Sequence, residues 1–149
     1  MILASQDFED NQVISDRFTC RGEGDCPQLS ISDVPEGAKS LCLLFHDPDA
    51  VGGDFTHWLV WNIPSLTTEI PCNSLPISCV EGTNGYGKTE YGAPCPPDGS
   101  GTHHYIFELY ALDTELDLPD STNQMQLRDA IKQNVIDQTV LTGIVQAKE

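Results

Sequence analysis

The segment SLCLLFHDPDAVGGDFTHWLVWNI, residues 40–63, decides the fold of this chain. Its two apolar runs, Leu41–Phe45 and Trp58–Trp61, are each about as long as a strand and have no polar face. Such runs are typical of strands that are buried on both faces of a sheet. Pro48 ends the first run because its ring removes a backbone donor, and Gly52-Gly53 lets the chain turn back. We therefore predict two neighbouring central strands.

Polar side chains gather where these strands meet the turn. Asp47 closes the first strand and His57 opens the second, so antiparallel pairing would bring both to one edge of the sheet. In the later run that begins at His103, the two-residue period of a strand places His103 and Tyr105 on one face and His104 on the other. The sequence therefore predicts a candidate site built from a carboxylate, two imidazoles and a phenol.

The rest of the chain predicts one mainly β domain, residues 1–149, with a single clear helix. The helix is expected over residues 122–135, because Ser121 and Gln124 have the spacing of a capping box and apolar residues follow at helical spacing. Six of the ten prolines lie between Pro64 and Pro97, so residues 65–102 are predicted to form an ordered loop. Further strands are expected within residues 6–19 and over 28–34, 105–112 and 139–145.

Charge and hydropathy limit the partners of the chain. The formal net charge of −16 argues against nucleic acid and against anionic membrane surfaces, because both would repel the protein. No stretch approaches the roughly 20 apolar residues of a transmembrane helix. The first ten residues, MILASQDFED, contain no basic region of a signal peptide. From these features we expect a cytoplasmic protein.

The cysteines leave several pairings open. Without export, reduced thiols are the expectation. Cys42 lies within an apolar strand and is expected in the core. Cys20 with Cys26, and Cys72 with Cys79, are close enough in sequence to bridge across loops, but spacing alone does not decide this. No pair has the CxxC spacing of a zinc or thioredoxin site, so no metal is expected at the cysteines.

Several separated motifs carry a resemblance to a known family. DPDAVGGDFTHWLVWNIP (47–64), YGAPCPPDGSGTHHYIFELYALD (91–113) and FTCRGEGDCPQL (18–29) resemble the bacterial and archaeal, Raf-kinase-inhibitor-like branch of the phosphatidylethanolamine-binding protein family. The resemblance implies an antiparallel two-sheet β-sandwich of the Greek-key kind, with an anion-binding pocket at one edge. Carried over position by position, it implies a pocket lined by Asp47, Asp49, His57, Pro97, Gly99, His103 and Tyr105.

The chain departs from the family pattern near this pocket. His104 stands where the family has an arginine, and an imidazole that is mostly neutral at pH 7 is expected to hold a carboxylate less firmly. Other departures are Cys26, Val51, Glu90 and Ala93.

Together, the residues and the resemblance favour a binding protein without catalysis or cofactor. Two imidazoles and a phenol can donate to phosphate oxygens, and Asp47 can accept from an ammonium group. We therefore expect a small anion or a phospholipid head group such as phosphoethanolamine as ligand. Binding through His57 and His103 should strengthen as pH falls from about 8 to 6, because imidazoles gain charge there.

Two alternatives come from different functional classes. Relatives of this family resemble inhibitors of serine proteases or kinases, and the loop over residues 65–90 could contact such a partner. An enzyme could use His57, His103 and Asp47 as a two-histidine, one-carboxylate metal triad. It could also use Cys95 as a nucleophile near His103.

Overall fold

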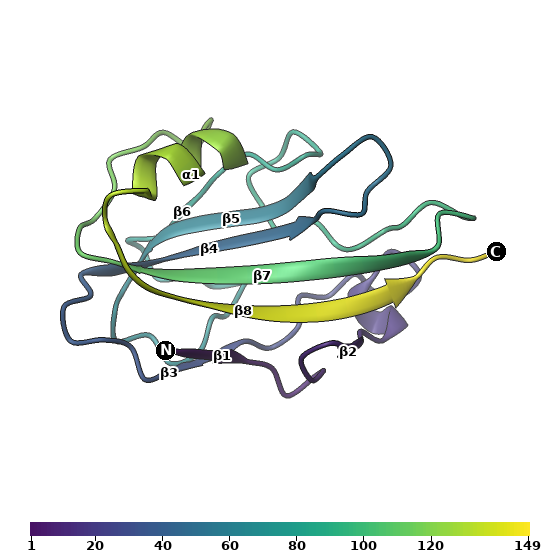
Figure 1. Ribbon diagram of the computed structural model, residues 1–149, viewed down its shortest axis with the longest axis horizontal. Helices are drawn as coiled ribbons and strands as arrows, with labels where there is room; N and C mark the ends of the chain where they lie inside the picture. Colours follow the sequence, from purple (N-terminus) through teal and green to yellow (C-terminus); the bar gives the residue numbers. More distant parts are fainter.

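The computed structural model describes all 149 residues and is mainly β, with one α-helix (Figure 1). The strands are β1 Ile2–Ala4, β2 Gln12–Val13, β3 Ser30–Ser32, β4 Ser40–Asp47, β5 Phe55–Ile63, β6 Val80–Glu81, β7 Thr102–Leu112 and β8 Val135–Gln146. The helices are the 3-10 turn η1, Asp16–Phe18, and α1, Gln124–Ile131.

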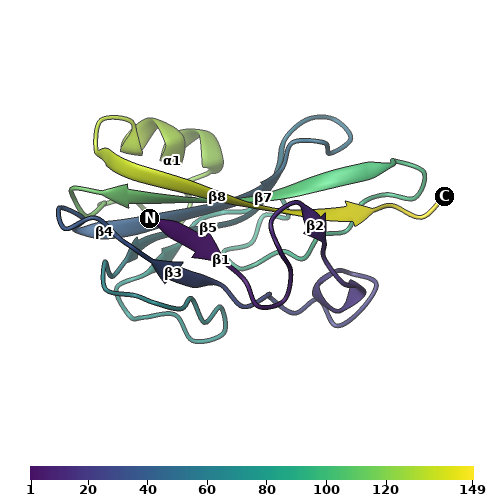
Figure 2. The same cartoon turned by 60° about the horizontal axis from the view of Figure 1, so that its bottom comes forward.

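Six strands form the main sheet, in the order β2-β8-β7-β4-β5-β6. The two predicted central strands pair with each other, and β4 also pairs with β7. A second, two-stranded sheet of β1 and β3 lies on the face away from α1 (Figure 2). The expectation of a mainly β fold with a helix near the C-terminus is confirmed. The two layers of the sandwich are unequal, however, because loops form most of the second layer. The pairing of β2 with β8 is parallel, which differs from the antiparallel arrangement that we expected.

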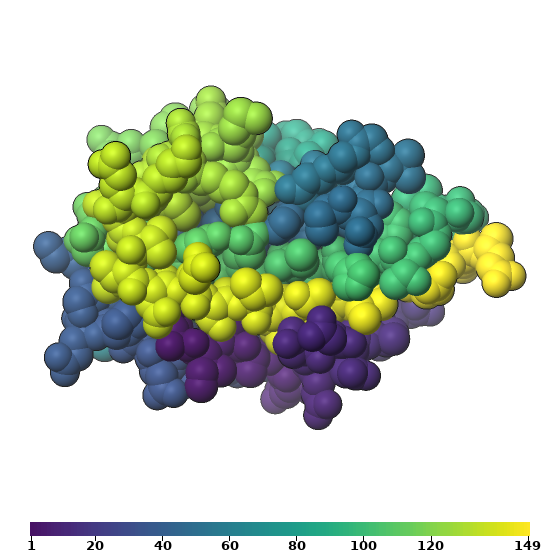
Figure 3. Space-filling model, in the orientation of Figure 1, coloured from purple at the N-terminus to yellow at the C-terminus, as the bar shows by residue number.

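Side-chain alternation along β4 builds a core on each face of the sheet. Leu41, Leu43 and Phe45 point to the larger core, under β1 and β3, whereas Cys42 and Leu44 point to the smaller core under α1. All five are fully buried. This explains the unbroken apolar run, since a strand covered on both faces has no polar side. The space-filling view shows α1 over one half of the outer face, with the loop between β4 and β5 beside it (Figure 3).

The helix is shorter than predicted and starts later. Its N-cap is Asn123, whose side chain accepts from the backbone N–H of Gln126 in a capping box. The expected cap, Ser121, lies in the preceding turn, where the Thr122 hydroxyl donates to the Pro119 carbonyl. Ser121 and Asn123 both have the sequence spacing of an N-cap. The turn from Pro119 to Thr122 includes Ser121, so Asn123 becomes the cap. No helix in the structure has the length and apolar character of a membrane span.

The last residue of the predicted helix belongs instead to the last strand, β8. β8 begins at Val135, which we expected on the helix, and it pairs with β7 along almost its whole length. The β-branched residues of this stretch suit a strand as well as a helix, so long-range pairing settles their conformation. The strand β1 was not predicted, and Gln28–Val34 contributes only Ser30–Ser32.

The expectation of reduced thiols was wrong for four of the six cysteines. Disulfides join Cys20 to Cys95 and Cys26 to Cys72, so the bonds span 75 and 46 residues rather than short loops. Cys42 is free and buried in the core, as predicted, and Cys79 is also free. Disulfides persist mainly in oxidising compartments. The two disulfides therefore argue against the cytoplasmic location that we expected from the N-terminal sequence.

Candidate functional site

A cavity of about 240 Å³ opens where β4 ends and where β5 and β7 begin. Its floor carries polar side chains, and its walls are mostly aromatic, aliphatic or proline. The cavity is lined by Asp47, Ala50, Val51, Phe55, His57, Tyr86, Cys95, Pro96, Pro97, His103 and Tyr105.

Strand alternation delivers three of the predicted residues to the floor. Asp47 follows Phe45 on the core face of β4, and His103 and Tyr105 precede Phe107 on the same face of β7. The Phe45 and Phe107 rings stack with their centroids 3.8 Å apart and close the core below the cavity. Asp47, His103 and Tyr105 are each almost completely buried. The cavity floor is therefore part of the rigid sheet.

A β-bulge brings His57 to the same cavity. Phe45 pairs with Trp58 and His46 pairs with Thr56, which leaves His57 as the extra residue on β5. Strict alternation would direct His57 away from the face that Trp58 occupies. The bulge instead turns it toward Tyr105, with ring centroids 5.2 Å apart. The sequence placed His57 at the correct edge, but the reason for its direction is visible only in the pairing.

Both ring nitrogens of His103 are engaged by the protein. Nδ1 lies 2.6 Å from Oδ2 of Asp47, and Nε2 lies 2.8 Å from the hydroxyl of Ser100. That hydroxyl also lies 2.5 Å from the Pro97 carbonyl, to which it donates. His103 therefore has no free N–H to offer the cavity, contrary to the direct contact we expected.

Ser100 is a site residue that our sequence reasoning missed. It lies in the turn Gly99-Ser100-Gly101, three residues before His103, and that spacing was the available signal. Ser100, His103 and Asp47 form a chain of hydrogen bonds that resembles the serine–histidine–aspartate arrangement of hydrolases. Here the Pro97 carbonyl, 2.5 Å from the Ser100 hydroxyl, competes with the imidazole for the single serine proton, so the arrangement differs from one in which the imidazole alone accepts it.

His57 keeps one nitrogen available to a ligand. Nδ1 donates to the carbonyl of Gly92 at 2.8 Å, which leaves Nε2 without a protein partner. Burial lowers the pKa of His57, and the Gly92 carbonyl and the Asp47 charge only partly oppose this. Near neutral pH, Nε2 is therefore a hydrogen-bond acceptor, and it becomes a donor when the ring is protonated at lower pH.

Two tyrosines complete the cavity. Burial, and then the nearby Asp47 carboxylate, raises the pKa of Tyr105, so its phenol stays a neutral O–H. Tyr86 comes from the long loop and is half exposed at the rim, and its hydroxyl donates to the Ala93 carbonyl at 3.3 Å. Its ring meets Phe55 edge to face. No periodic pattern in the loop could have assigned Tyr86 to the site.

Two residues implied by the resemblance lie outside the cavity lining. Asp49 turns to the other side, where its carboxylate accepts from the backbone N–H of His104 at 2.8 Å and lies 2.7 Å from the His104 ring. These contacts with His104 lower the pKa of Asp49. Gly99 lies in a turn with φ of 78°, which favours glycine. The histidine in the place of the family arginine thus does hold a carboxylate.

The enzyme alternatives lose their chemical groups in this structure. The metal triad would need a ring nitrogen of His103, and both of these already have protein partners, Asp47 and Ser100; no cluster of histidine, cysteine and acidic side chains is arranged to hold a metal ion. Cys95 is bonded to Cys20 and is not a free thiol nucleophile.

Comparison with known proteins identifies the family. The family profile described as phosphatidylethanolamine-binding protein matches residues 4–146. The chain belongs to the phosphatidylethanolamine-binding protein family. It is 40% identical to a UPF0098 protein of Pyrococcus horikoshii, over 99% of this chain and 77% of that protein.

Solved structures of this family agree with the fold. The homologue CT736 of Chlamydia trachomatis matches with a TM-score of 0.89 and 35% identity, covering 96% of this chain and 95% of that one. E. coli YbcL matches with a TM-score of 0.89 and 31% identity, covering 98% of each chain. The chain therefore lies in the branch of the phosphatidylethanolamine-binding protein family that contains YbcL and the UPF0098 proteins.

A second polar cluster lies directly behind this family's pocket, on the opposite face of β4. His46 Nδ1 lies 2.7 Å from Asp54, and Nε2 lies 2.5 Å from Glu108. Arg128 of α1 donates to Glu108 at 2.6 Å, and so does the hydroxyl of Tyr110. Burial disfavours charge on His46, but the bonds to Glu108 and Asp54 outweigh it and raise its pKa. The cluster ties the helix to the sheet and to the loop that walls the cavity.

This cluster predicts a pH dependence of stability on the alkaline side. Because the folded pKa of His46 is raised above the value of about 6.5 in the unfolded chain, its contribution is fully present below that pH. The contribution is lost as pH rises through the folded pKa. Urea unfolding of the wild-type protein and of His46→Gln between pH 6 and 9 checks this. The difference between the two should shrink as pH rises, and a constant difference would contradict it.

Proposed function

We propose that the cavity binds a small molecule carrying both a phosphate and an ammonium group, such as phosphoethanolamine, and that the protein has no catalytic activity of its own. The observation that carries the proposal is the convergence of Asp47, His57 and Tyr105 on one cavity floor. Membership of the phosphatidylethanolamine-binding protein family supports a head group of this class. The hydrogen bond from Ser100 to Pro97 supports binding over hydrolysis.

The size of the cavity favours a head group over a whole lipid. At about 240 Å³, it is smaller than the roughly 300–1,000 Å³ of pockets that enclose drug-sized ligands. Apolar residues of the rim, including Val51 and Tyr86, are exposed and can contact a short organic substituent on the phosphate. A lipid would therefore enter with its head group only, and its chains would remain outside.

The polar groups suggest how such a ligand is oriented. Asp47 supplies the buried negative charge for an ammonium group; its Oδ1 accepts from the Asp49 backbone N–H, and a carboxylate oxygen can accept a further hydrogen bond. Tyr105 supplies a neutral O–H, and protonated His57 supplies an N–H, for phosphate oxygens. An anion beside His57 favours its charged form, so binding should take up a proton.

The expected pH dependence of binding follows from His57. Because burial lowers its pKa, affinity for phosphoethanolamine should change little from pH 8 to 7 and rise as pH falls below about 6.5. This window is lower than the one that unperturbed histidines predict. At low pH, His57→Ala should weaken binding by about 1.5–3 kcal/mol, as for a hydrogen bond to a charged group. Titration calorimetry across the range measures both effects.

His104→Ala is the matched control, because its side chain lies on the opposite face of β7 and outside the cavity. Any change in the protonation of phosphoethanolamine with pH affects the wild-type protein, His57→Ala and His104→Ala equally. Equal losses in His57→Ala and His104→Ala, or the same pH profile in wild type and His57→Ala, would refute the site.

A second candidate function, inhibition of a serine protease or kinase, has one observation in its favour. Leu66 and Ile77 are almost fully exposed in the long loop, where a partner could contact them. Exposed apolar side chains on a loop are a feature of partner-binding surfaces. More observations concern the cavity than the exposed loop, so we place ligand binding before inhibition of a partner.

A further inference from the structure

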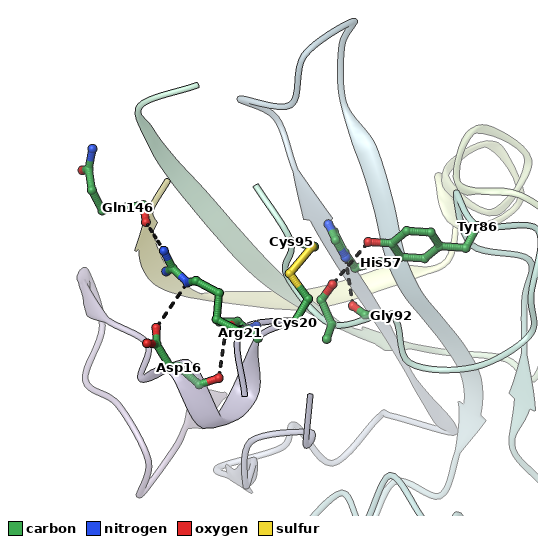
Figure 4. Close-up of a disulfide and its surroundings, with 10 residues drawn as sticks. Asp16, Cys20, Arg21, His57, Tyr86, Gly92, Cys95 and Gln146 are labelled. Carbon is green, nitrogen blue, oxygen red and sulfur yellow. Dashed lines mark hydrogen bonds and ion pairs between the residues drawn. A yellow bond between two sulfur atoms is a disulfide. The ribbon is translucent and has the colours of Figure 1, made fainter. Parts of the chain in front are cut away.

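The disulfide Cys20–Cys95 forms part of the cavity wall. Cys95 lines the cavity, whereas Cys20 lies in the loop that follows η1, and their Cα atoms are 5.2 Å apart. Figure 4 shows the bond between the Arg21 loop on one side and His57 and Tyr86 on the other. The bond therefore joins the wall of the candidate site to the N-terminal part of the chain.

The wall segment, residues 92–97, depends on few other contacts. It belongs to no strand. The backbone N–H of Gly92 donates to the His57 carbonyl at 2.8 Å, and the Cys20 N–H donates to the Pro94 carbonyl at 3.0 Å. The same segment supplies the Gly92 carbonyl that holds Nδ1 of His57. What holds this segment thus also determines how His57 faces the ligand.

The two disulfides differ in accessibility. Cys20 and Cys95 are both exposed, whereas Cys26 and Cys72 are only partly exposed and pack against the larger core. A thiolate must reach a disulfide sulfur to react with it, so access controls the rate of exchange. A reductant therefore reaches the bond in the cavity wall before the bond beside the core.

We propose that Cys20–Cys95 is a site of reversible thiol–disulfide exchange that controls the cavity. A thiolate of a dithiol reductant attacks one sulfur and forms a mixed disulfide, while the other cysteine leaves as a thiolate and takes a proton. The second thiol of the reductant then displaces the remaining cysteine. In total, two electrons and two protons pass to the protein, and the reductant becomes a disulfide.

Reduction loosens the wall without breaking the sheet. Residues 92–97 then remain attached by their hydrogen bonds and by the packing of the buried Gly92 and Pro94, and the chain loses a crosslink that closes a loop of 75 residues. The hydrogen bond that fixes His57 at Gly92 then opens more often, so ligand affinity falls. The consequence for affinity depends on the proposed function, whereas the loosening of the wall does not.

The order of reduction is the first test. The protein is treated with increasing dithiothreitol, the thiols are blocked with iodoacetamide, and the modified peptides are identified by mass spectrometry. Cys20 and Cys95 should be modified at lower dithiothreitol than Cys26 and Cys72. Simultaneous modification of all four, or the reverse order, would overturn the proposal.

The second test measures the loosening of the wall and the loss of ligand affinity independently of each other. Hydrogen exchange of the Gly92 amide should become at least about tenfold faster after reduction, and exchange of the Leu44 amide in the sheet should not change. Phosphoethanolamine affinity should fall by about tenfold. Unchanged exchange at Gly92 overturns the inference. Faster exchange with no binding in either redox state supports the exchange site and refutes the proposed function.

The double variant Cys20→Ser/Cys95→Ser lacks the wall disulfide but keeps Cys26–Cys72. It therefore shows the effect of losing the wall disulfide without the use of a reductant. Cys79→Ser is the control, since it removes a free thiol outside the cavity. The double variant should reproduce the faster Gly92 exchange, and the control should match the wild-type protein.

Discussion

Glu108→Ala is expected to lower the free energy of unfolding by about 3 kcal/mol, the lower end of the range for breaking a buried ion pair. Glu108 accepts from Arg128, from Tyr110 and from His46, and its side chain is only 16% exposed. Burial opposes its charge, yet these three partners hold its pKa far below the usual range. Removing the carboxylate leaves cationic groups between α1 and the sheet without their shared partner. Urea unfolding measures the loss.

Asp129→Ala on the same helix is the matched control. Asp129 pairs with Lys132 at 3.0 Å, but both side chains are more than 70% exposed. Exposed pairs contribute little, so the expected loss is below about 0.5 kcal/mol. Equal losses for Glu108→Ala and Asp129→Ala would mean that the cluster behind the pocket does not anchor the helix.

Asp47→Ala should have an equal or larger effect, about 3–5 kcal/mol of unfolding free energy. Asp47 is 2% exposed and is the partner of Nδ1 of His103, which is itself fully buried. Without the carboxylate, the ring has no acceptor in the cavity floor. Phosphoethanolamine binding should also fall below detection, because the variant removes the negative charge that faces the ammonium group. Chemical denaturation and calorimetry measure the two losses.

Asp49→Ala controls for the loss of a neighbouring carboxylate. Its side chain is 39% exposed and pairs with His104 outside the cavity. We expect a loss of less than about 1 kcal/mol and unchanged ligand affinity. If Asp49→Ala abolished binding while Asp47→Ala did not, the assignment of the cavity floor would be wrong.

Local patterns predicted the central strands well and the chain ends poorly. β4 and β5 follow from their apolar runs, and β7 follows from alternation, because each pattern lies within one strand. The boundary between α1 and β8 was misplaced because Val135 fits either element. Its pairing with Leu112 of β7 decides the matter, and that partner lies far away in the sequence.

The cysteine pairs show the same limit. Spacing left open the local bridges Cys20–Cys26 and Cys72–Cys79, whereas in the structure distant loops meet and Cys20 pairs with Cys95. Which sulfurs meet depends on how the loops pack over the sheet, and the sequence spacing of the cysteines contains no information about that packing.

By itself, the sequence placed Asp47 at the edge of the sheet where β4 ends, and it placed His103 and Tyr105 on one face of β7. Alternation is a property of the extended backbone, so it needs no knowledge of neighbouring strands. Only the tertiary structure decided the direction of His57, because a bulge exists only as a mismatch between two paired strands. It also decided that both nitrogens of His103 are occupied, since one partner comes from β4 and the other from a turn. Chemical identity and strand period are local, whereas hydrogen-bond partners depend on how distant segments pack.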